Sequence, residues 1–261
     1  PEQEETEPPQ INDKTPALAS FAVNCNIIAF EEGYDPMIGR EREVEELAEI
    51  LCRRSKNNPI LLGEAGVGKT ALVEALAQKI VTREAPEFLL SKQIFSLDLG
   101  SLIAGTKYRG QFEERLKKII EELSMNEDFI IFIDEIHTLI GAGGAEGTMD
   151  AANMLKPLLA RGKIKCIGAT TISEYRKTIA KDGGLDRRFE KLHISEPTKV
   201  HAVKILEGLK SKYQEFHNVV YKDHHCQLAV KLSSRYITDR YLPDKALDII
   251  DQAGAKTKTR C

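Results

Sequence analysis

The sequence predicts an α/β domain with a five-stranded parallel sheet, followed by a small domain built only of helices. Up to Pro197, short apolar runs alternate with helical patterns, which is typical of parallel strands covered by helices on both faces. Beyond Pro197 we find three helical patterns and no convincing strand. We therefore expect a linker over residues 1–16, a large domain over 17–197 and a small domain over 198–261.

The first sixteen residues are rich in glutamate, proline and glutamine. Such a segment buries too little apolar surface to order itself, so we expect an acidic linker. The chain starts at Pro1 and not at methionine, which suggests a piece of a longer protein in which another domain precedes this linker. An overhang unrelated to the fold is the alternative explanation.

The predicted elements follow from apolar runs and apolar periods. Short apolar runs predict the strands, and the last of them is the weakest: 59–62, 94–97, 129–133, 166–169 and 192–194. Apolar residues at helical spacing predict the helices of the large domain: 40–54, 70–82, 112–123 and 149–159. The same spacing predicts the helices of the small domain: 198–215, 223–236 and 243–257.

Composition excludes some classes of protein. The net charge of −3 gives no general attraction to nucleic acid or to anionic membranes. No apolar run approaches the roughly 20 residues that span a bilayer. The five cysteines are odd in number and lack CxxC spacing, which favours reduced thiols in a cytosol-like compartment. A metal site at His224-His225-Cys226 is the less favoured alternative to a solvated helix start, because no second ligand pair matches it.

A glycine-rich segment between a predicted strand and a predicted helix fits G-x-x-x-x-G-K-[ST] in full: Gly63, Glu64, Ala65, Gly66, Val67, Gly68, Lys69 and Thr70. Glycines let backbone N–H groups surround phosphate oxygens, and the following helix directs its positive end at the same anion. Lys69 is expected to reach the β- and γ-phosphates, and the Thr70 hydroxyl to bind Mg²⁺. The alternative, a glycine-rich loop without function, is disfavoured by this context.

Two carboxylates follow the predicted strand 129–133 directly. Ligands bind at the carboxyl ends of strands in such sheets, so Asp134 is expected to hold Mg²⁺ and Glu135 to orient the attacking water. An acidic turn after a strand is a weak signal by itself. Its place about 65 residues after the phosphate loop strengthens it and favours hydrolysis over binding alone.

At this point the sequence resembles the Clp ATPases, a family of AAA+ proteins, from about residue 15 to its end. The resemblance rests on several long motifs in addition to the phosphate loop and the acidic pair: 35–40, 104–110, 132–138, 168–171, 187–189 and 242–246. The sequence is most similar to the first of the two ATPase domains in a Clp protein of the A or C type.

The resemblance implies roles for further residues. Ile38 and Gly39 would line the adenine pocket, and Thr171 would be the polar sensor near the γ-phosphate. Arg187 and Arg188 would reach the site of a neighbouring subunit as arginine fingers, which can raise the rate by ~10³–10⁵. Without the resemblance, a solvated basic pair would be the better interpretation of these two arginines.

The resemblance also implies a central-pore loop. Lys107, Tyr108 and Arg109 match it, and the Tyr108 ring would grip an extended polypeptide. A surface tyrosine or a ring that stacks on nucleic acid are the alternatives without the resemblance. The glycine-rich segment 141–147 would form a second pore loop or a disordered connection.

Two departures from the family pattern stand out. Gly183-Gly184 precedes the arginine pair where the family often has acidic or small residues, and this is expected to loosen the segment. The small domain carries Lys245 but no separate motif for a nucleotide-sensing arginine.

The resemblance implies an ATP- and Mg²⁺-dependent unfoldase in the cytoplasm, or in the stroma of a bacterium-derived organelle. The expected partners are copies of itself in a ring, expected to be a hexamer, and unfolded protein chains. In the full-length protein they include adaptors and a barrel-shaped protease, which this segment alone is not expected to bind. Nucleic acid and membranes are not expected partners. A motor on nucleic acid and a ring-assembly module with little hydrolysis are the rival interpretations, and the near-neutral charge and the intact carboxylates disfavour them.

Overall fold

The computed structural model describes residues 15–104, 109–140, 151–160 and 162–259. In chain order the strands are β1 (Ala22–Asn24), β2 (Asn58–Leu62), β3 (Gln93–Leu97), β4 (Phe129–Ile133), β5 (Lys165–Thr170) and β6 (Phe189–His193). The helices up to β4 are α1 (Pro16–Phe21), α2 (Cys25–Glu31), α3 (Glu41–Cys52), α4 (Lys69–Val81), η1 (Glu87–Leu89), α5 (Leu99–Ile103) and α6 (Arg109–Met125). The later helices are α7 (His137–Ile140), α8 (Ala151–Ala160), α9 (Ile172–Lys177), η2 (Ile179–Lys181), α10 (Gly183–Asp186), α11 (Lys199–His217), α12 (Asp223–Tyr236) and α13 (Asp244–Lys258).

The strands form one six-stranded sheet in the order β1-β3-β4-β5-β2-β6. The five predicted strands are parallel, as expected. The sheet gains a sixth strand that the prediction missed, since β1 pairs with β3 in the antiparallel direction. Three residues ending in Asn24 are too short and too polar a pattern to indicate a strand, and only the pairing with β3 defines it.

The weakest predicted strand is displaced by a few residues. The sequence favoured 192–194, but β6 runs over Phe189–His193. Along this edge strand Phe189 and Leu192 are buried, while Lys191 is exposed. The apolar residues are therefore too sparse to form the run by which the other strands were recognised.

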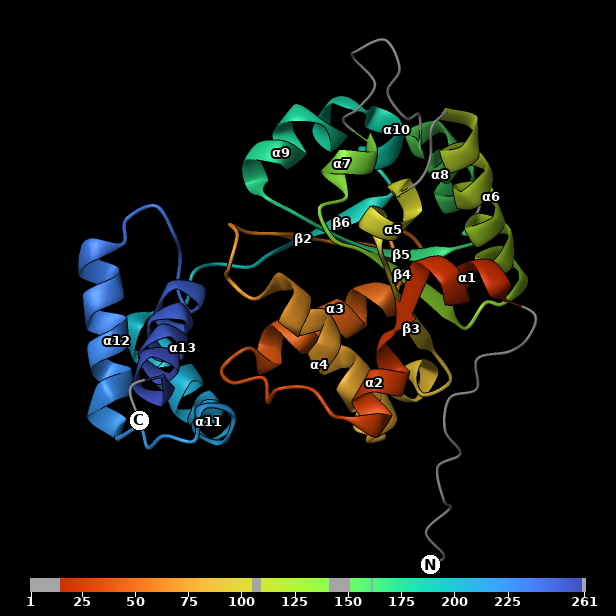
Figure 1. The fold of residues 1–261 in the computed structure, drawn as a ribbon. Helices are drawn as coiled ribbons and strands as arrows, with labels where there is room; N and C mark the ends of the chain where they lie inside the picture. The colour runs from red at the N-terminus through yellow and green to blue at the C-terminus, as the bar shows by residue number, and fades with distance from the viewer. Residues whose placement is uncertain (1–14, 105–108, 141–150, 161, 260–261) are drawn as a thin grey trace, which may run out of the picture.

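Helices cover both faces of the sheet (Figure 1). Helices α2, α3 and α4 pack on one face around Leu47, Leu72 and Phe132. Helices α1, α6, α8 and α10 cover the other face around Phe112 and Phe189. Helices α11, α12 and α13 form a separate small domain with its own apolar core beside the large one (Figure 1).

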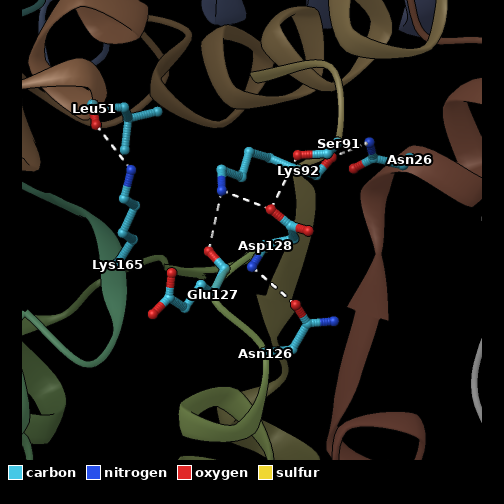
Figure 2. A network of polar contacts seen from close by, with 8 residues as sticks. All are labelled: Asn26, Leu51, Ser91, Lys92, Asn126, Glu127, Asp128 and Lys165. Carbon is cyan, nitrogen blue, oxygen red and sulfur yellow. Dashed lines mark hydrogen bonds and ion pairs between the residues drawn. The ribbon is translucent and has the colours of Figure 1, made fainter. Parts of the chain in front are cut away.

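Charged side chains at the amino ends of β3, β4 and β5 find partners near the ends of the strands (Figure 2). The Lys92 ammonium lies 2.6 Å from a carboxylate oxygen of Asp128 and donates to the backbone oxygen of Glu127 at 3.2 Å. Lys165 donates to the backbone oxygen of Leu51 at 3.1 Å. Lys92, Asp128 and Lys165 therefore each have a partner at this end of the sheet.

The histidine–cysteine segment at the start of α12 shows the features of an ordinary helix start. His224 is exposed, while Cys226 is buried in the small-domain core. The His225 ring accepts from the backbone N–H of Lys222 at 3.2 Å. Within the described ranges no three His, Cys, Asp or Glu side chains are grouped so that they could hold a metal ion.

Two further findings concern the whole described part of the chain. Four cysteines in it are free thiols, namely Cys25, Cys52, Cys166 and Cys226. None of the helices in this part is long and apolar enough to cross a membrane.

Candidate nucleotide site

The predicted phosphate loop connects the buried strand β2 to helix α4. Gly66 and Gly68 have φ angles of +81° and +97°, which glycine adopts without strain, and Gly68 is the N-cap of α4. A Cβ atom on Gly63 would lie 2.4 Å from the backbone oxygen of Ile194, so no larger residue fits there. The loop can therefore turn tightly and present the positive end of the α4 dipole to an anion.

The Lys69 side chain lies along this loop. Its ammonium donates to the backbone oxygens of Gly63 at 3.1 Å and Glu64 at 2.9 Å. Burial lowers the pKa of Lys69, and the nearby carboxylates of Asp134, Glu64 and Glu135 oppose this shift. Backbone carbonyls compensate a half-buried cation only partly, so an anionic phosphate would be a stronger partner for Lys69.

The carboxylate of Asp134 lies directly after β4, where it meets the phosphate loop. The Thr70 hydroxyl donates to Asp134 Oδ2 at 2.8 Å, and the Glu135 backbone N–H donates to Asp134 Oδ1 at 2.8 Å. Glu135 has a φ angle of +48°, which is uncommon for a residue with a side chain and costs of order 1–3 kcal/mol. Strain of this kind is frequent at functional sites, and here it accompanies an exposed carboxylate.

Polar residues at the carboxyl end of β5 add to the same edge of the sheet. Thr171 is the N-cap of α9, and its side chain accepts from the Glu174 backbone N–H at 3.2 Å. The Thr170 hydroxyl lies 2.9 Å from His137 Nδ1. The sequence analysis named Thr171, which directly follows β5, but gave no role to Thr170 or His137. Thr170 is the last residue of β5 and His137 is the first of α7, so neither directly follows a strand.

These elements enclose a cavity of about 720 Å³ between the two domains. The predicted residues that line it are Ile38, Ala65, Gly66, Val67, Gly68, Lys69, Thr70, Asp134, Glu135 and Thr171. Gly39, Gly63 and Glu64 support the site without lining the cavity: Gly39 has a φ angle of +72° and donates to Glu41 Oε1 at 3.0 Å. The cavity is large enough for a nucleoside triphosphate.

The small domain supplies lining residues that the sequence reasoning missed: Ile205, Leu209, Pro243, Asp244 and Leu247. Asp244 packs so closely on the phosphate loop that a Cβ on Gly66 would lie 2.6 Å from the Asp244 Cβ. Arg240 forms ion pairs with Asp244 at 2.6 Å and Asp248 at 2.5 Å, and it does not line the cavity. The small domain therefore meets the phosphate loop with a carboxylate that its own arginine compensates.

The connection between the domains is held from both sides. Arg40 donates to the backbone oxygen of Ser195, and the backbone N–H of Leu242 donates to Glu196 Oε1 at 2.8 Å. Lys245 lies 3.9 Å from the same Glu196 oxygen. Lys245, which the sequence singled out, therefore contributes to the contact between the domains.

The arginine pair lies away from the cavity. Arg187 and Arg188 are both exposed at the carboxyl end of α10, and neither lines the cavity of its own chain. Of the predicted pore loop, Lys107 and Tyr108 lie outside the described residues, as does the glycine-rich segment 141–147, while Arg109 is the first residue of α6.

The chain belongs to the AAA family of ATPases. The family model described as "ATPase family associated with various cellular activities (AAA)" matches residues 59–192, which is more than half of the chain. A second model, the AAA lid domain, matches residues 198–261.

Within this family the sequence is that of a Clp-type AAA+ ATPase. It is 53% identical over 249 residues to the negative regulator of genetic competence ClpC/MecB of Bacillus subtilis (strain 168), covering 95% of this chain and 31% of that protein. It is 54% identical over 251 residues to the chaperone protein ClpB of Oceanobacillus iheyensis, covering 96% and 31%. The chain thus spans about a third of these relatives, and such even identities do not separate the ClpC and ClpB types.

Solved structures agree on the fold. The Saccharomyces cerevisiae Hsp104–ADP complex superposes with a TM-score of 0.86 at 44% identity, covering 93% of this chain and 42% of that one. A closed-state reconstruction of Hsp104 with ATPγS and FITC-casein gives a TM-score of 0.85 at 44% identity, covering 94% and 42%.

Proposed function

We propose that this chain binds ATP with Mg²⁺ in the cavity between its domains and hydrolyses it to drive the unfolding of protein substrates. One observation carries the proposal: the phosphate loop, Asp134 and Glu135 meet at one edge of the sheet, beside a cavity of about 720 Å³. Membership of the AAA family of ATPases supports it, as do the similar Hsp104 structures with ADP and with ATPγS.

The residues around the phosphate loop fit a magnesium ion. The Thr70 hydroxyl oxygen and Asp134 Oδ2 lie 2.8 Å apart, and both are the hard oxygen ligands that Mg²⁺ prefers. We assign Thr70 and Asp134 to hold the ion, directly or through water. Bound there, Mg²⁺ would neutralise charge on the phosphate oxygens.

The remaining groups of the site have complementary tasks. Lys69 would exchange its two backbone carbonyl partners for phosphate oxygens, which better compensate a half-buried ammonium. Glu135 would orient the attacking water and accept its proton, a task for which an exposed carboxylate at the cavity is suited. Thr171 would offer a hydroxyl near the γ-phosphate, and Ile38 with Gly39 would bound the adenine pocket.

We assign Arg187 and Arg188 to the site of a neighbouring subunit. Both side chains are exposed and lie outside the cavity of their own chain, so they are available to the site of another copy. This requires a ring, for which we propose a hexamer. In the ring, Tyr108, with Lys107 and Arg109 beside it, would grip the substrate chain.

The wider partners follow from the relatives. One of the similar Hsp104 structures is a complex with FITC-casein, which supports protein chains as substrates. Relatives named as ATP-binding subunits of the ATP-dependent Clp protease support a barrel protease and adaptors as partners of the longer protein. We place the protein in the cytoplasm or in the stroma of a bacterium-derived organelle.

The hydrolysis part of the proposal is tested with Glu135→Gln. The amide cannot accept a proton, so ATP turnover should fall roughly 10²- to 10⁴-fold while ATP binding persists. Glu127→Gln is the matched control, because Glu127 lies at the opposite end of the same strand, β4, and should leave turnover unchanged. Equal turnover of Glu135→Gln and the unaltered chain would contradict the assignment.

The unfolding part is tested with Tyr108→Ala in the full-length protein. Without the aromatic ring of Tyr108, substrate chains should no longer be gripped. Unfolding of a casein-like substrate should therefore be lost while ATP turnover persists. Tyr236→Ala is the matched control, because Tyr236 is an exposed tyrosine at the end of α12. Unfolding that survives in Tyr108→Ala would exclude the pore-loop assignment.

A further inference from the structure

The arginine pair is carried by a segment that cannot hold its own shape. Helix α10 comprises only Gly183–Asp186 and begins with two glycines. So short a helix has few internal hydrogen bonds, and glycine loses more backbone freedom on ordering than other residues. Arg187 and Arg188 follow it directly, so contacts from outside α10 must fix where they point.

The amino end of α10 is anchored by Asp182. Its carboxylate caps the helix by accepting from the backbone N–H groups of Gly184 at 3.0 Å and Leu185 at 3.3 Å. The same carboxylate forms an ion pair with Lys156 of α8, and this interaction lowers the pKa of Asp182. The glycine pair is therefore not as loose as its sequence suggests.

The carboxyl end of α10 is anchored by Asp186, the residue before the arginine pair. Asp186 accepts from the hydroxyl of Tyr175 on α9 and lies 3.3 Å from the Lys191 ammonium of β6. Lys191 also lies 5.0 Å from the centre of the Tyr175 ring. The three side chains therefore tie α9, α10 and β6 together.

Tyr175 is a rigid part of this cluster. It is 5% exposed and packs in the core of the sheet face with Leu185 and Phe189. Burial raises the pKa of Tyr175, so its hydroxyl keeps the proton that it donates to Asp186. Its backbone N–H donates to the Thr171 backbone oxygen at 2.9 Å, so Tyr175 lies one helical turn after the cavity-lining Thr171.

We propose that Tyr175 and Asp186, with Lys191, are positioning residues that set where Arg187 and Arg188 project toward the neighbouring subunit. This inference rests on the proposed function, because it assumes that the arginines act on the site of a neighbour. Misplacing a catalytic group by about 1 Å can cost on the order of 10²-fold in rate. The Tyr175 hydroxyl on α9 is thus required for full ATP turnover in a ring of subunits.

The direct test compares Tyr175→Phe with Tyr221→Phe. Both tyrosines are buried and donate through their hydroxyls, but Tyr221 does so within the small domain, to the Ile250 backbone oxygen at 2.8 Å. Tyr175→Phe should lower ring turnover roughly 10- to 100-fold with an unchanged KM for ATP, and Tyr221→Phe should leave turnover within about twofold. Equal turnover of Tyr175→Phe and the unaltered chain would overturn the proposal.

Mixing subunits separates a positioning defect from damage to the chain's own site. Glu135→Gln subunits cannot hydrolyse ATP but keep well-placed arginines, which they would lend to Tyr175→Phe sites. Turnover of an equal mixture should therefore exceed the mean of the two variants measured alone. A mixture of Tyr175→Phe with the double variant Arg187→Ala/Arg188→Ala should show no such gain. Additive turnover in the first mixture would place the defect in the variant's own site and overturn the proposal.

Asp186 offers a rescue by a conservative variant. The amide oxygen of Asp186→Asn can still accept from Tyr175, whereas Asp186→Ala offers no acceptor. We expect Asp186→Asn to keep most of the turnover that Asp186→Ala loses. Equal losses in both would show that the hydrogen bond is not what places the arginines.

Hydrogen exchange tests the same claim without any ATP turnover. Amides of residues 182–188 should exchange at least several-fold faster in Tyr175→Phe than in Tyr221→Phe. Unchanged exchange would overturn the positioning role even in a preparation that hydrolyses no ATP. Failure of the proposed function would give a different result. The unaltered chain would then show no ATP turnover, or its turnover would not depend on Arg187 and Arg188.

Discussion

The two ends of the central sheet carry similar side chains under opposite conditions. At the amino ends of β3, β4 and β5, Lys92 and Asp128 pair with each other at 2.6 Å (Figure 2). At the carboxyl ends, Lys69 has only backbone oxygens for hydrogen-bond partners in the described part of the chain, and Glu135 is exposed in a strained backbone conformation. Lys92 and Asp128 therefore satisfy each other at one end, whereas Lys69 and Glu135 at the other end are left for a ligand.

In this fold, the side chains that stabilise the sheet and those that are available to a ligand lie at opposite ends of the strands. A paired polar network holds loops in place but offers nothing to an incoming anion. Polar groups beside a cavity that lack full hydrogen bonding lower the stability of the unliganded protein. Binding of a ligand then raises that stability. Variants at matched positions of the two ends should therefore separate the two properties.

The largest expected effect is the loss of nucleotide affinity in Lys69→Met. Removing the ammonium should weaken ATP binding at least ~10²-fold, since charge-assisted contacts to phosphate contribute a few kcal/mol. The free energy of unfolding should stay the same or rise, because a partly buried cation that is only partly compensated disappears. Calorimetric titration with ATP and urea unfolding measure the two quantities. A less stable Lys69→Met chain would contradict the claim that Lys69 serves ligand binding and not stability.

The next effect concerns glycines with positive φ. Gly66→Ala should cost about 1–2 kcal/mol of backbone strain and also push against Asp244, so both stability and ATP affinity should fall. Gly162, at φ +64°, has open space around its Cβ position. Gly162→Ala should therefore show the strain alone, with ATP affinity unchanged. Titration and thermal unfolding distinguish the two, and equal affinities would contradict the close contact at Gly66.

At the opposite end of the sheet, Lys92→Met should act on stability alone. It leaves Asp128 without its ammonium partner, so the free energy of unfolding should fall by about 1 kcal/mol. Turnover of ATP should remain within about twofold. Urea unfolding and phosphate release measure the two effects. A large loss of turnover would show that the two ends are not independent.

The smallest effect is a dependence of stability on acid. The hydrogen bond from Lys92 holds the pKa of Asp128 below its ordinary value of 3.8. A carboxyl group with a lowered pKa stabilises the fold above its unfolded pKa, and this contribution is lost as the pH falls through the folded pKa. Because Asp128 is 43% exposed, the contribution should be below about 1 kcal/mol. The difference in unfolding free energy between Asp128→Asn and the unaltered chain should therefore shrink as the pH falls below 3.8 and through the lower folded pKa of Asp128. A difference that is undiminished in this range would contradict the stabilising role of the Lys92–Asp128 pair.

Much of the fold could be predicted because burial leaves a clear pattern. Strands β2 and β4 are buried at every position, and β4 as well as β2 from Pro59 onward appear as apolar runs in the sequence. Strand β1 was missed and β6 was displaced because both lie at the edges of the sheet. Their pairing with a neighbouring strand defines them, and their amino-acid composition does not. Short helices such as α9 and α10 leave too few residues to show a period.

The candidate site divides in the same way. Residues within one continuous motif, such as Lys69 and Thr70, could be assigned from sequence because the loop and its helix are local. Asp244 could not, because it joins the site only through the packing of the small domain on Gly66. The role of Tyr175 was equally hidden, since its hydroxyl meets Asp186 only in the folded chain.

The most direct test of the central claim is ATP turnover per subunit as a function of protein concentration. Specific activity should rise steeply with concentration, and this rise should disappear in Arg187→Ala/Arg188→Ala, because each site is completed by the arginines of a neighbour. Appreciable turnover that is independent of concentration would contradict it, because each subunit would then hydrolyse ATP alone.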